Sequence, residues 1–122
     1  MQRFEDLLRL ANEARNRIRE ISPEEAYQLS QSGAVLIDVR DQKEYKTGHI
    51  SGAIQISRDT LENHIFEVVP DLSQSIVCYC TLGHRSALAA DILQQLGYLN
   101  VASIVGGFKA YLASSNNHTL AS

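Results

Sequence analysis

The chain is built around the stretch Ile76-Val77-Cys78-Tyr79-Cys80-Thr81-Leu82-Gly83-His84-Arg85-Ser86. Its first residues are apolar and β-favouring, which predicts a short strand with Cys80 at its end. Gly83 then predicts a tight turn, and apolar residues recur at helical spacing from Ser86 to Leu96. The stretch therefore predicts a strand, a loop and the N-terminus of a helix in immediate succession.

A cysteine in this position has two interpretations. Free backbone N–H groups and the dipole at the start of a helix stabilise a thiolate relative to the thiol. Arg85 adds a permanent positive charge, and such a turn can hold an anion. Free cysteines are also among the most buried residue types, so Cys80 could simply belong to the core. The glycine turn and the basic side chains behind it favour the reactive interpretation.

Length and composition bound the class of protein. The chain has 122 residues, enough for one domain, with 44% hydrophobic and 20% charged residues. A formal net charge of −3 gives no electrostatic basis for nucleic acid as the main partner. No apolar run is long enough to span a membrane, and Glu5 and Asp6 stand where a secretory signal would begin. We therefore expect a cytoplasmic protein without nucleic-acid or membrane partners.

The chain has two cysteines, Cys78 and Cys80. Residues two apart on one strand point to the same side, and a disulfide between them would be strained. No spacing of cysteine and histidine matches a structural zinc site, so no metal is predicted. The pattern leaves chemistry at one of the two thiols or at neither.

The two ends of the chain differ from its middle. Residues 3–20 carry apolar side chains at helical spacing, with nearly balanced charges on the opposite face. This predicts an amphipathic helix packed onto the domain, a dimer contact or partner helix being the alternative. Ser22, Pro23 and Glu25 then form a helix-start signal. Residues 114–122 are polar and are expected to form a frayed tail.

Strands and helices alternate through the rest of the chain. The predicted strands are 34–40, 53–56, 76–80 and 101–105, and the predicted helices are 58–69, 86–96 and 108–112, with a helical turn within 41–48. This alternation predicts an α/β domain with a mainly parallel sheet flanked by helices. Ligands bind beyond the carboxyl ends of the strands in such sheets, where Asp38, Arg40 and Cys80 lie. We expect a functional cleft at that edge.

Three blocks of the sequence, in order, resemble the signatures of rhodanese-like domains. They are Leu36-Ile37-Asp38-Val39-Arg40 with Glu44-Tyr45 and Gly48-His49-Ile50-Ser51-Gly52-Ala53-Ile54; the stretch 76–86; and Val105-Gly106-Gly107-Phe108. The resemblance implies a three-layer domain with a five-stranded, mainly parallel sheet. It divides the chain into an N-terminal helical extension (1–20), a rhodanese-like domain (21–113) and the polar tail (114–122).

The resemblance implies a sulfurtransferase. In this family an active cysteine takes sulfane sulfur from a donor such as thiosulfate, becomes a persulfide, and passes the sulfur to a thiol, or to cyanide in the assay. Cys80 would be that cysteine and Arg85 the second catalytic residue, with no cofactor. The donor would be thiosulfate or a persulfide, and the acceptor a thiol such as glutathione or a thioredoxin-like protein.

The same resemblance places substrate binding on the loop behind the cysteine. The loop residues are Thr81, Leu82, Gly83, His84 and Ser86, whose N–H groups would stabilise the thiolate and the persulfide. Arg85 would bind an anionic donor through its planar fork, and His84 would contribute at most specificity.

Two residues of the first block, Asp38 and Arg40, are further substrate-binding candidates. Their strand is expected to neighbour the Cys80 strand, so they would shape the donor site. The alternative, favoured for Arg40, is a structural ion pair with Asp41 or Glu44.

Two other functions are compatible with the resemblance. Rhodanese-like domains also serve as non-catalytic binding or regulatory modules. Phosphatases and arsenate reductases of similar fold place one more residue between cysteine and arginine. Here four residues, 81–84, separate Cys80 from Arg85, which is the spacing of the sulfurtransferases. Sulfur transfer is therefore the leading hypothesis.

Overall fold

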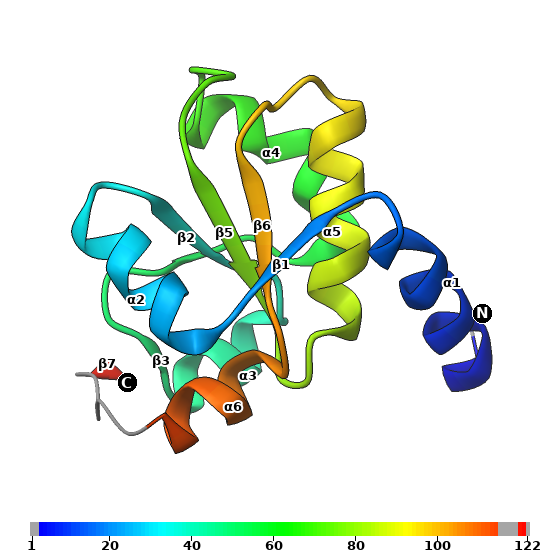
Figure 1. The fold of residues 1–122 in the computed structure, drawn as a ribbon, viewed down its shortest axis with the longest axis horizontal. Coiled ribbons are helices and arrows are strands. Elements are labelled where there is room, and N and C mark those ends of the chain that lie inside the picture. The colour runs from blue at the N-terminus through cyan, green and yellow to red at the C-terminus, as the bar shows by residue number, and fades with distance from the viewer. Residues whose placement is uncertain (1–2, 115–119, 122) are drawn as a thin grey trace.

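The computed structural model describes residues 3–114 and 120–121, and its centre is a five-stranded parallel sheet (Figure 1). The strand order is β1-β6-β5-β2-β4, and each neighbouring pair is parallel. The strands are β1 (Arg19–Ile21), β2 (Val35–Asp38), β4 (Ile54–Gln55), β5 (Ile76–Tyr79) and β6 (Val101–Ile104). The predicted α/β class with a parallel sheet is confirmed.

Helices cover both faces of the sheet. They are α1 (Phe4–Arg15), α2 (Pro23–Gln31), α3 (Gln42–Thr47), the 3-10 turn η1 (Arg58–Thr60), α4 (Leu61–Val68), α5 (His84–Gln95) and α6 (Gly107–Ala113). Residues of α4 and α5 join the core on one face, and residues of α2 and α6 join it on the other. Figure 1 shows α1 on the outer side of α5, away from the sheet. The result is the predicted three-layer arrangement with one added helix.

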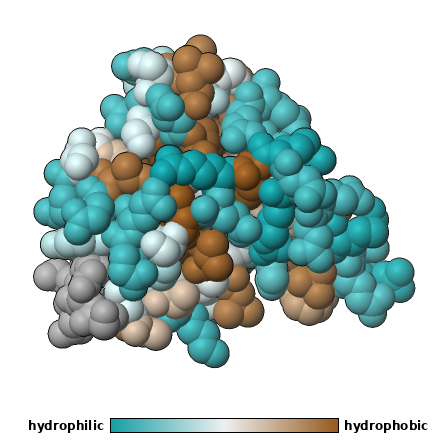
Figure 2. Space-filling view, in the orientation of Figure 1, coloured by the Kyte–Doolittle hydropathy of each residue, from teal (hydrophilic) through white to brown (hydrophobic). Residues whose placement is uncertain are grey.

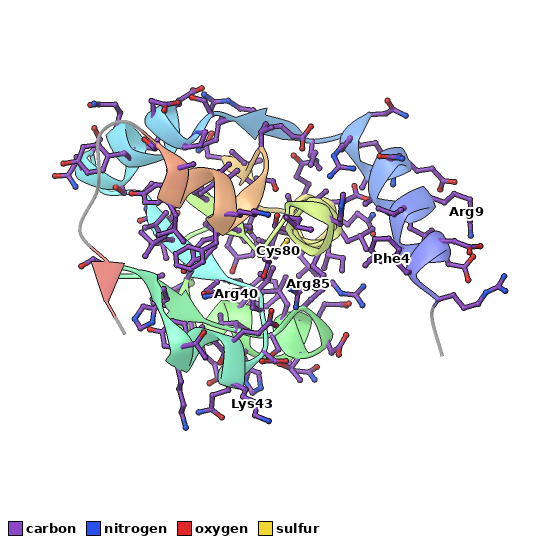
Figure 3. The ribbon with its side chains drawn as sticks, turned by 90° about the horizontal axis from the view of Figure 1, so that it is seen from below. Phe4, Arg9, Arg40, Lys43, Cys80 and Arg85 are labelled. Carbon is purple, nitrogen blue, oxygen red and sulfur yellow. The ribbon has the colours of Figure 1, made fainter. Side chains whose placement is uncertain are left out.

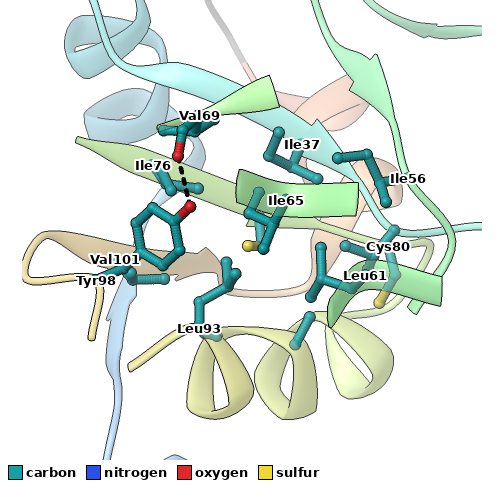
Figure 4. Packing of buried hydrophobic residues seen from close by; sticks show 14 residues of the cluster. Ile37, Ile56, Leu61, Ile65, Val69, Ile76, Cys80, Leu93, Tyr98 and Val101 are labelled. Atoms are coloured by element: carbon teal, nitrogen blue, oxygen red, sulfur yellow. Dashed lines mark hydrogen bonds between the residues drawn. The ribbon is translucent and has the colours of Figure 1, made fainter. Parts of the chain in front are cut away.

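Side chains of the central strand alternate between the two cores. Ile76, Cys78 and Cys80 pack with α4 and α5, whereas Val77 and Tyr79 pack on the opposite face. A strand buried on both faces needs this continuous apolar run. Figure 4 shows Cys80 at one end of the first cluster, with Leu61 and Ile56 labelled nearby. Both cysteines therefore face the same side, as predicted.

The predicted helix over residues 3–20 is wrong over its last residues, 16–20. The helix ends at Arg15, and residues 19–21 form the edge strand β1, paired with β6. Ile18 packs on one face of the sheet and Ile21 on the other, as an odd spacing on extended chain requires. A spacing of three also fits a helix, so the sequence pattern did not distinguish the two. Pairing with β6 decided it.

A second, two-stranded sheet lies apart from the first. Its strands, β3 (His49–Ile50) and β7 (Leu120–Ala121), pair in antiparallel fashion. This pairing was not predicted, because the segment 114–122 was read as a polar tail. Residues 115–119 and 122 of that tail lie outside the described residues.

The face of the molecule seen in Figure 2 is mostly polar. Figure 2 shows a largely hydrophilic face, including the side where α1 lies, with hydrophobic residues in small separate groups. In the part of the chain that the structure describes, no helix combines the length and the apolar character needed to cross a membrane. The polar outer side of α1 matches the predicted solvated face of an amphipathic helix.

Candidate active site

The helix behind the cysteine begins two residues earlier than predicted. Its first residue is His84 rather than Ser86, and Gly83 precedes it with a left-handed φ of +100°. Glycine adopts this conformation without steric cost, so the chain turns sharply between β5 and α5. Arg85 consequently lies in the first turn of α5, where its own N–H has no partner within the helix.

The Cys80 sulfur lies inside this turn. The N–H groups of Gly83 and Ser86 donate to Sγ at 3.1 and 3.3 Å, and the Ser86 hydroxyl lies 3.5 Å from it. Ser86 Oγ in turn lies 2.8 Å from the buried Ser103 hydroxyl of β6, a contact the sequence did not predict. These donors stabilise a negative charge on sulfur.

The loop leaves further donors for a second anionic atom. Among residues 3–114 and 120–121, no acceptor is found for the N–H groups of Leu82, His84 and Arg85. Together with the N–H groups on Sγ they form what we term the anion cradle: the N–H groups of residues 82–86 around Cys80. Such a turn at a helix N-terminus binds anions well.

A pocket of about 120 Å³ opens onto the cysteine. It is lined by Phe4, Leu7, Cys80, Thr81, Leu82, His84 and Arg85. Cys80 itself is only 1% exposed, whereas Leu82 at the rim is half exposed. A larger hollow of about 340 Å³ lies along β4 and α4, but no cysteine lines it. The smaller pocket is therefore the candidate active site.

The first residues of α6 form hydrogen bonds to the start of the loop at Cys80 and Thr81. Phe108 N–H donates to the Cys80 carbonyl at 2.7 Å, and Lys109 N–H donates to the Thr81 carbonyl at 3.1 Å. These bonds require a close approach at Gly107, which has a left-handed φ of +64°. A Cβ placed there would lie 2.4 Å from the Cys80 carbonyl oxygen. The double-glycine block therefore fits the loop, a role that sequence reasoning did not assign.

Arg85 is held by a carboxylate. Its Nη1 and Nη2 donate to Glu44 of α3 at 2.8 and 3.1 Å, and Nη2 also contacts Thr81 Oγ1 at 3.3 Å. The hydrogen bond to Arg85 lowers the pKa of Glu44 to about 2. The fork expected to bind the donor is therefore occupied by Glu44, and donor binding by Arg85 stays a prediction. What the contacts show is an anchor between the loop and α3.

Sequence reasoning missed Glu44 as a residue of the site. It was considered only as a partner for Arg40, although it stands in the first signature block. One local signal was available: Asp41 and Glu44 have capping-box spacing, and both bonds of the box form at the start of α3. The capping box fixes the start of α3 and so places Glu44 in its first turn. Which group the Glu44 carboxylate pairs with depends on the tertiary fold.

Acid is expected to weaken the Glu44–Arg85 pair. A pKa lowered by folding contributes stability above the unfolded value, and that stability is lost as the pH falls through the folded value. For Glu44 this window runs from 4.5 down to about 2. Because the side chains are 30% and 33% exposed, we expect a contribution of no more than about 1 kcal/mol.

Urea unfolding across that pH window measures this contribution. The native chain should lose more stability on acidification than Glu44→Gln, while Glu62→Gln, which alters an exposed carboxylate of α4, should follow the native curve. Parallel curves for the native chain and Glu44→Gln would contradict the assignment.

His84 faces α1. Its Nδ1 lies 3.1 Å from Arg15 Nη2, and Phe4 approaches its ring edge-on at 6.4 Å between centroids. Burial and the charge of Arg15 lower the pKa of His84, so the ring is neutral at neutral pH. A neutral Nδ1 accepts from the guanidinium. Because its pKa is lowered, His84 gains a positive charge only at a more acidic pH than an ordinary histidine does.

Asp38 and Arg40 form a buried pair with each other. Arg40 Nε and Nη2 donate to the Asp38 carboxylate at distances from 2.7 to 3.2 Å, and Nη2 also donates to the Gly48 carbonyl at 2.7 Å. The guanidinium lies 4.6 Å from the centroid of the Phe108 ring. Arg40 does form an ion pair, but its partner is Asp38, not Asp41 or Glu44. These contacts favour the structural role, and donor binding by the pair stays a prediction.

The second cysteine, Cys78, is fully buried among apolar side chains, and that burial raises the pKa of its thiol to about 12. Both cysteines are free thiols, but Cys80, unlike Cys78, lines the small pocket. A thiol that stays protonated in an apolar core favours a packing role for Cys78.

Comparison with known proteins agrees with this geometry. The sequence model of the Rhodanese-like domain matches residues 22–114. The thiosulfate sulfurtransferase GlpE of Pseudomonas entomophila is 37% identical over 101 residues, which cover 83% of this chain and 91% of that protein.

Solved structures share the fold. A Rhodopseudomonas palustris protein of unknown function, described as a possible tyrosine phosphatase, superposes with a TM-score of 0.79 at 31% identity, covering 93% of this chain and 91% of that one. The human single-domain sulfurtransferase TSTD1 superposes with a TM-score of 0.69 at 28% identity, covering 79% and 96%. On the strength of the match over residues 22–114, this chain belongs to the Rhodanese-like domain family.

Proposed function

We propose that this protein is a sulfurtransferase that carries sulfane sulfur as a persulfide on Cys80. The observation that carries the proposal is the position of the cysteine sulfur: it accepts two backbone N–H groups at the base of a small pocket. The unpaired N–H groups around it suit an anion one atom longer than a thiolate. The GlpE relatives, which are thiosulfate sulfurtransferases, support the same activity.

The reaction follows from these contacts. The Cys80 thiolate attacks the outer sulfur of thiosulfate, the sulfur–sulfur bond of the donor breaks, and sulfite leaves with its electron pair. The resulting persulfide carries its negative charge on the terminal sulfur, within reach of the anion cradle. An acceptor thiolate then attacks that sulfur, giving a persulfide on the acceptor and regenerating the Cys80 thiolate.

The size of the pocket limits which sulfur donors and acceptors can reach Cys80. A volume of about 120 Å³ admits a small anion or the end of a thiol, but not the body of a large molecule. We therefore propose thiosulfate or a persulfide as donor. We propose as acceptor a thiol presented from outside, such as glutathione or a thioredoxin-like protein, and we place the transfer in the cytoplasm.

Intact mass spectrometry tests the proposal. Incubation with thiosulfate should add one sulfur atom, peptide mapping should place it on Cys80, and cyanide should remove it as thiocyanate. The same preparation should release no phosphate from an aryl phosphate. If neither thiosulfate nor a cysteine persulfide adds sulfur, the protein is a binding module. Phosphate release without sulfur uptake would establish the phosphatase alternative instead.

A further inference from the structure

The N-terminal helix α1 contributes to the active site although it precedes the segment that matches the family, residues 22–114. Phe4 and Leu7 of α1 line the pocket above Cys80. Figure 3 shows Phe4 on the side of α1 nearer to Cys80 and Arg9 on its outer side. The helix was predicted to pack onto the domain, but no role in the site was predicted for it.

Arg15, the last residue of α1, makes the closest contacts between this helix and the cysteine loop (residues 80–86). Its Nη2 donates to the Gly83 carbonyl at 3.3 Å and to His84 Nδ1 at 3.1 Å. The remaining nitrogens of the guanidinium are held by Glu20 of β1 at 3.1 Å and by Asn12 at 2.7 Å. The side chain is 23% exposed, so the fork is fixed from both sides rather than free in solvent.

The contact with Gly83 bears directly on the anion cradle. In a trans peptide the carbonyl and the following N–H point in opposite directions. The Gly83 carbonyl accepts from Ala87 N–H at 3.2 Å within α5 and from Arg15. Arg15 thus adds a second constraint on this carbonyl, and with it on the His84 N–H of the same peptide. A carbonyl that accepts from a cation also polarises its peptide, which makes that N–H a stronger donor. Meanwhile the Gly83 N–H, one peptide earlier, donates to Cys80 Sγ.

We propose that Arg15 is a positioning residue of the active site: it holds the Gly83–His84 peptide so that the anion cradle is ordered before a donor arrives. The expected effect of Arg15 on turnover rests on the proposed sulfur transfer. The effect of Arg15 on the Cys80 thiolate does not depend on which sulfur donor the protein uses.

Other charged groups surround the loop and must be held constant in a test. Besides Arg15, the ionisable residues that interact with groups of the loop include Glu44 and Asp41, which act on Arg85, and Cys78, which lies near Cys80. Arg85 is already paired with Glu44, and Arg40 with Asp38. A substitution of Arg15 leaves both of those pairs in place.

Removing the Arg15 fork should leave α1 docked. Ala11 and Ala14 of the helix are fully buried against the domain. Just after the helix, Arg17 forms a bidentate pair with Asp91 of α5, with distances of 2.8 to 3.2 Å. Gln94 also donates to the Arg17 carbonyl at 2.7 Å. These contacts hold the helix without any help from Arg15.

The test compares Arg15→Gln with Arg9→Gln. Arg9 is a matched control, since it is an exposed arginine on the same helix and pairs with Asp6 and Glu13 of that helix. Two quantities are measured in the full chain: the rate of alkylation of Cys80 by iodoacetamide at one fixed pH, and kcat/KM for thiosulfate. In Arg15→Gln we expect the alkylation rate to fall about threefold and kcat/KM to fall about tenfold. Arg9→Gln should match the native chain in both.

Each outcome separates the possibilities. An unchanged alkylation rate in folded Arg15→Gln, with kcat/KM within about twofold of the native value, would overturn the proposal. If Arg15→Gln does not fold, Arg15→Lys replaces it; a lysine keeps the charge but loses the fork. We expect Arg15→Lys to give intermediate values, and native values would show that the fork is not needed. If alkylation slows as expected but the native chain transfers no sulfur from any donor, the proposed function fails and the positioning role stands.

Discussion

Cys80→Ser should reduce the turnover of thiosulfate by at least about 10³-fold while the domain stays folded. A serine hydroxyl is not ionised at neutral pH and is a poor nucleophile toward sulfur. The donors that hold the sulfur, the N–H groups of Gly83 and Ser86, can donate to a hydroxyl oxygen as well, so the loop keeps its contacts. Thiocyanate formation from thiosulfate and cyanide measures the loss, and urea unfolding checks that the fold is intact.

Cys78→Ala is the matched control for this experiment. Cys78 lies two residues earlier on the same strand and faces the same core, but it does not line the pocket as Cys80 does. Its removal should cost about 1–2 kcal/mol of stability through a small cavity, with turnover within about twofold of the native rate. Equal loss of turnover in both variants would mean that packing, rather than the Cys80 thiolate, limits the reaction.

Gly107→Ala should be the most disruptive single methyl group in the domain. Its Cβ would lie 2.4 Å from the Cys80 carbonyl oxygen and 2.6 Å from that of Thr81, and both are backbone atoms that cannot rotate away. The start of α6 must then move, which breaks the bonds from Phe108 N–H and Lys109 N–H to the loop. We expect a loss of about 2–4 kcal/mol in the free energy of unfolding and a fall in kcat/KM of at least about tenfold.

Gly33→Ala is the control for Gly107→Ala: it introduces the strain of a left-handed φ without a steric clash at Cβ. Gly33 also has a left-handed φ, +102°, but nothing lies within 4 Å of the position that its Cβ would take. Its substitution should cost only about 1–2 kcal/mol and leave turnover unchanged. Urea unfolding and thiosulfate kinetics on both variants give the comparison. Similar stability losses and unchanged turnover in Gly107→Ala would show that the loop does not depend on α6.

Local sequence was sufficient for the strand and for the position of Cys80 at its end. The apolar run that ends at Cys80, the following Gly83 and the helical pattern after it are properties of adjacent residues, and each one constrains the backbone directly. The alternation of such segments also predicted the parallel sheet. The start of α5 was placed two residues late because Gly83 and His84 were read as part of the turn, and the left-handed φ of Gly83 is what lets the helix begin at His84.

The partners of charged side chains were not predictable in this way. Arg40 had three acidic residues within four positions, and the fold pairs it with Asp38 rather than with Asp41 or Glu44. Glu44 is then free to take Arg85, which is 41 residues away along the chain. Which carboxylate pairs with which guanidinium depends on the path of the backbone between them. The local sequence pattern does not determine that path.

The sequence by itself determined the α/β class, the parallel sheet and the position of Cys80 at a strand end before a helix, because these follow from periodicity and from the conformational freedom of glycine. Only the tertiary structure decided that residues 19–21 are an edge strand, that Gly107 fits against the loop and that Arg15 reaches it from α1. Those features come from contacts between distant segments. Such contacts form only when the whole core is buried, so no local pattern reports them.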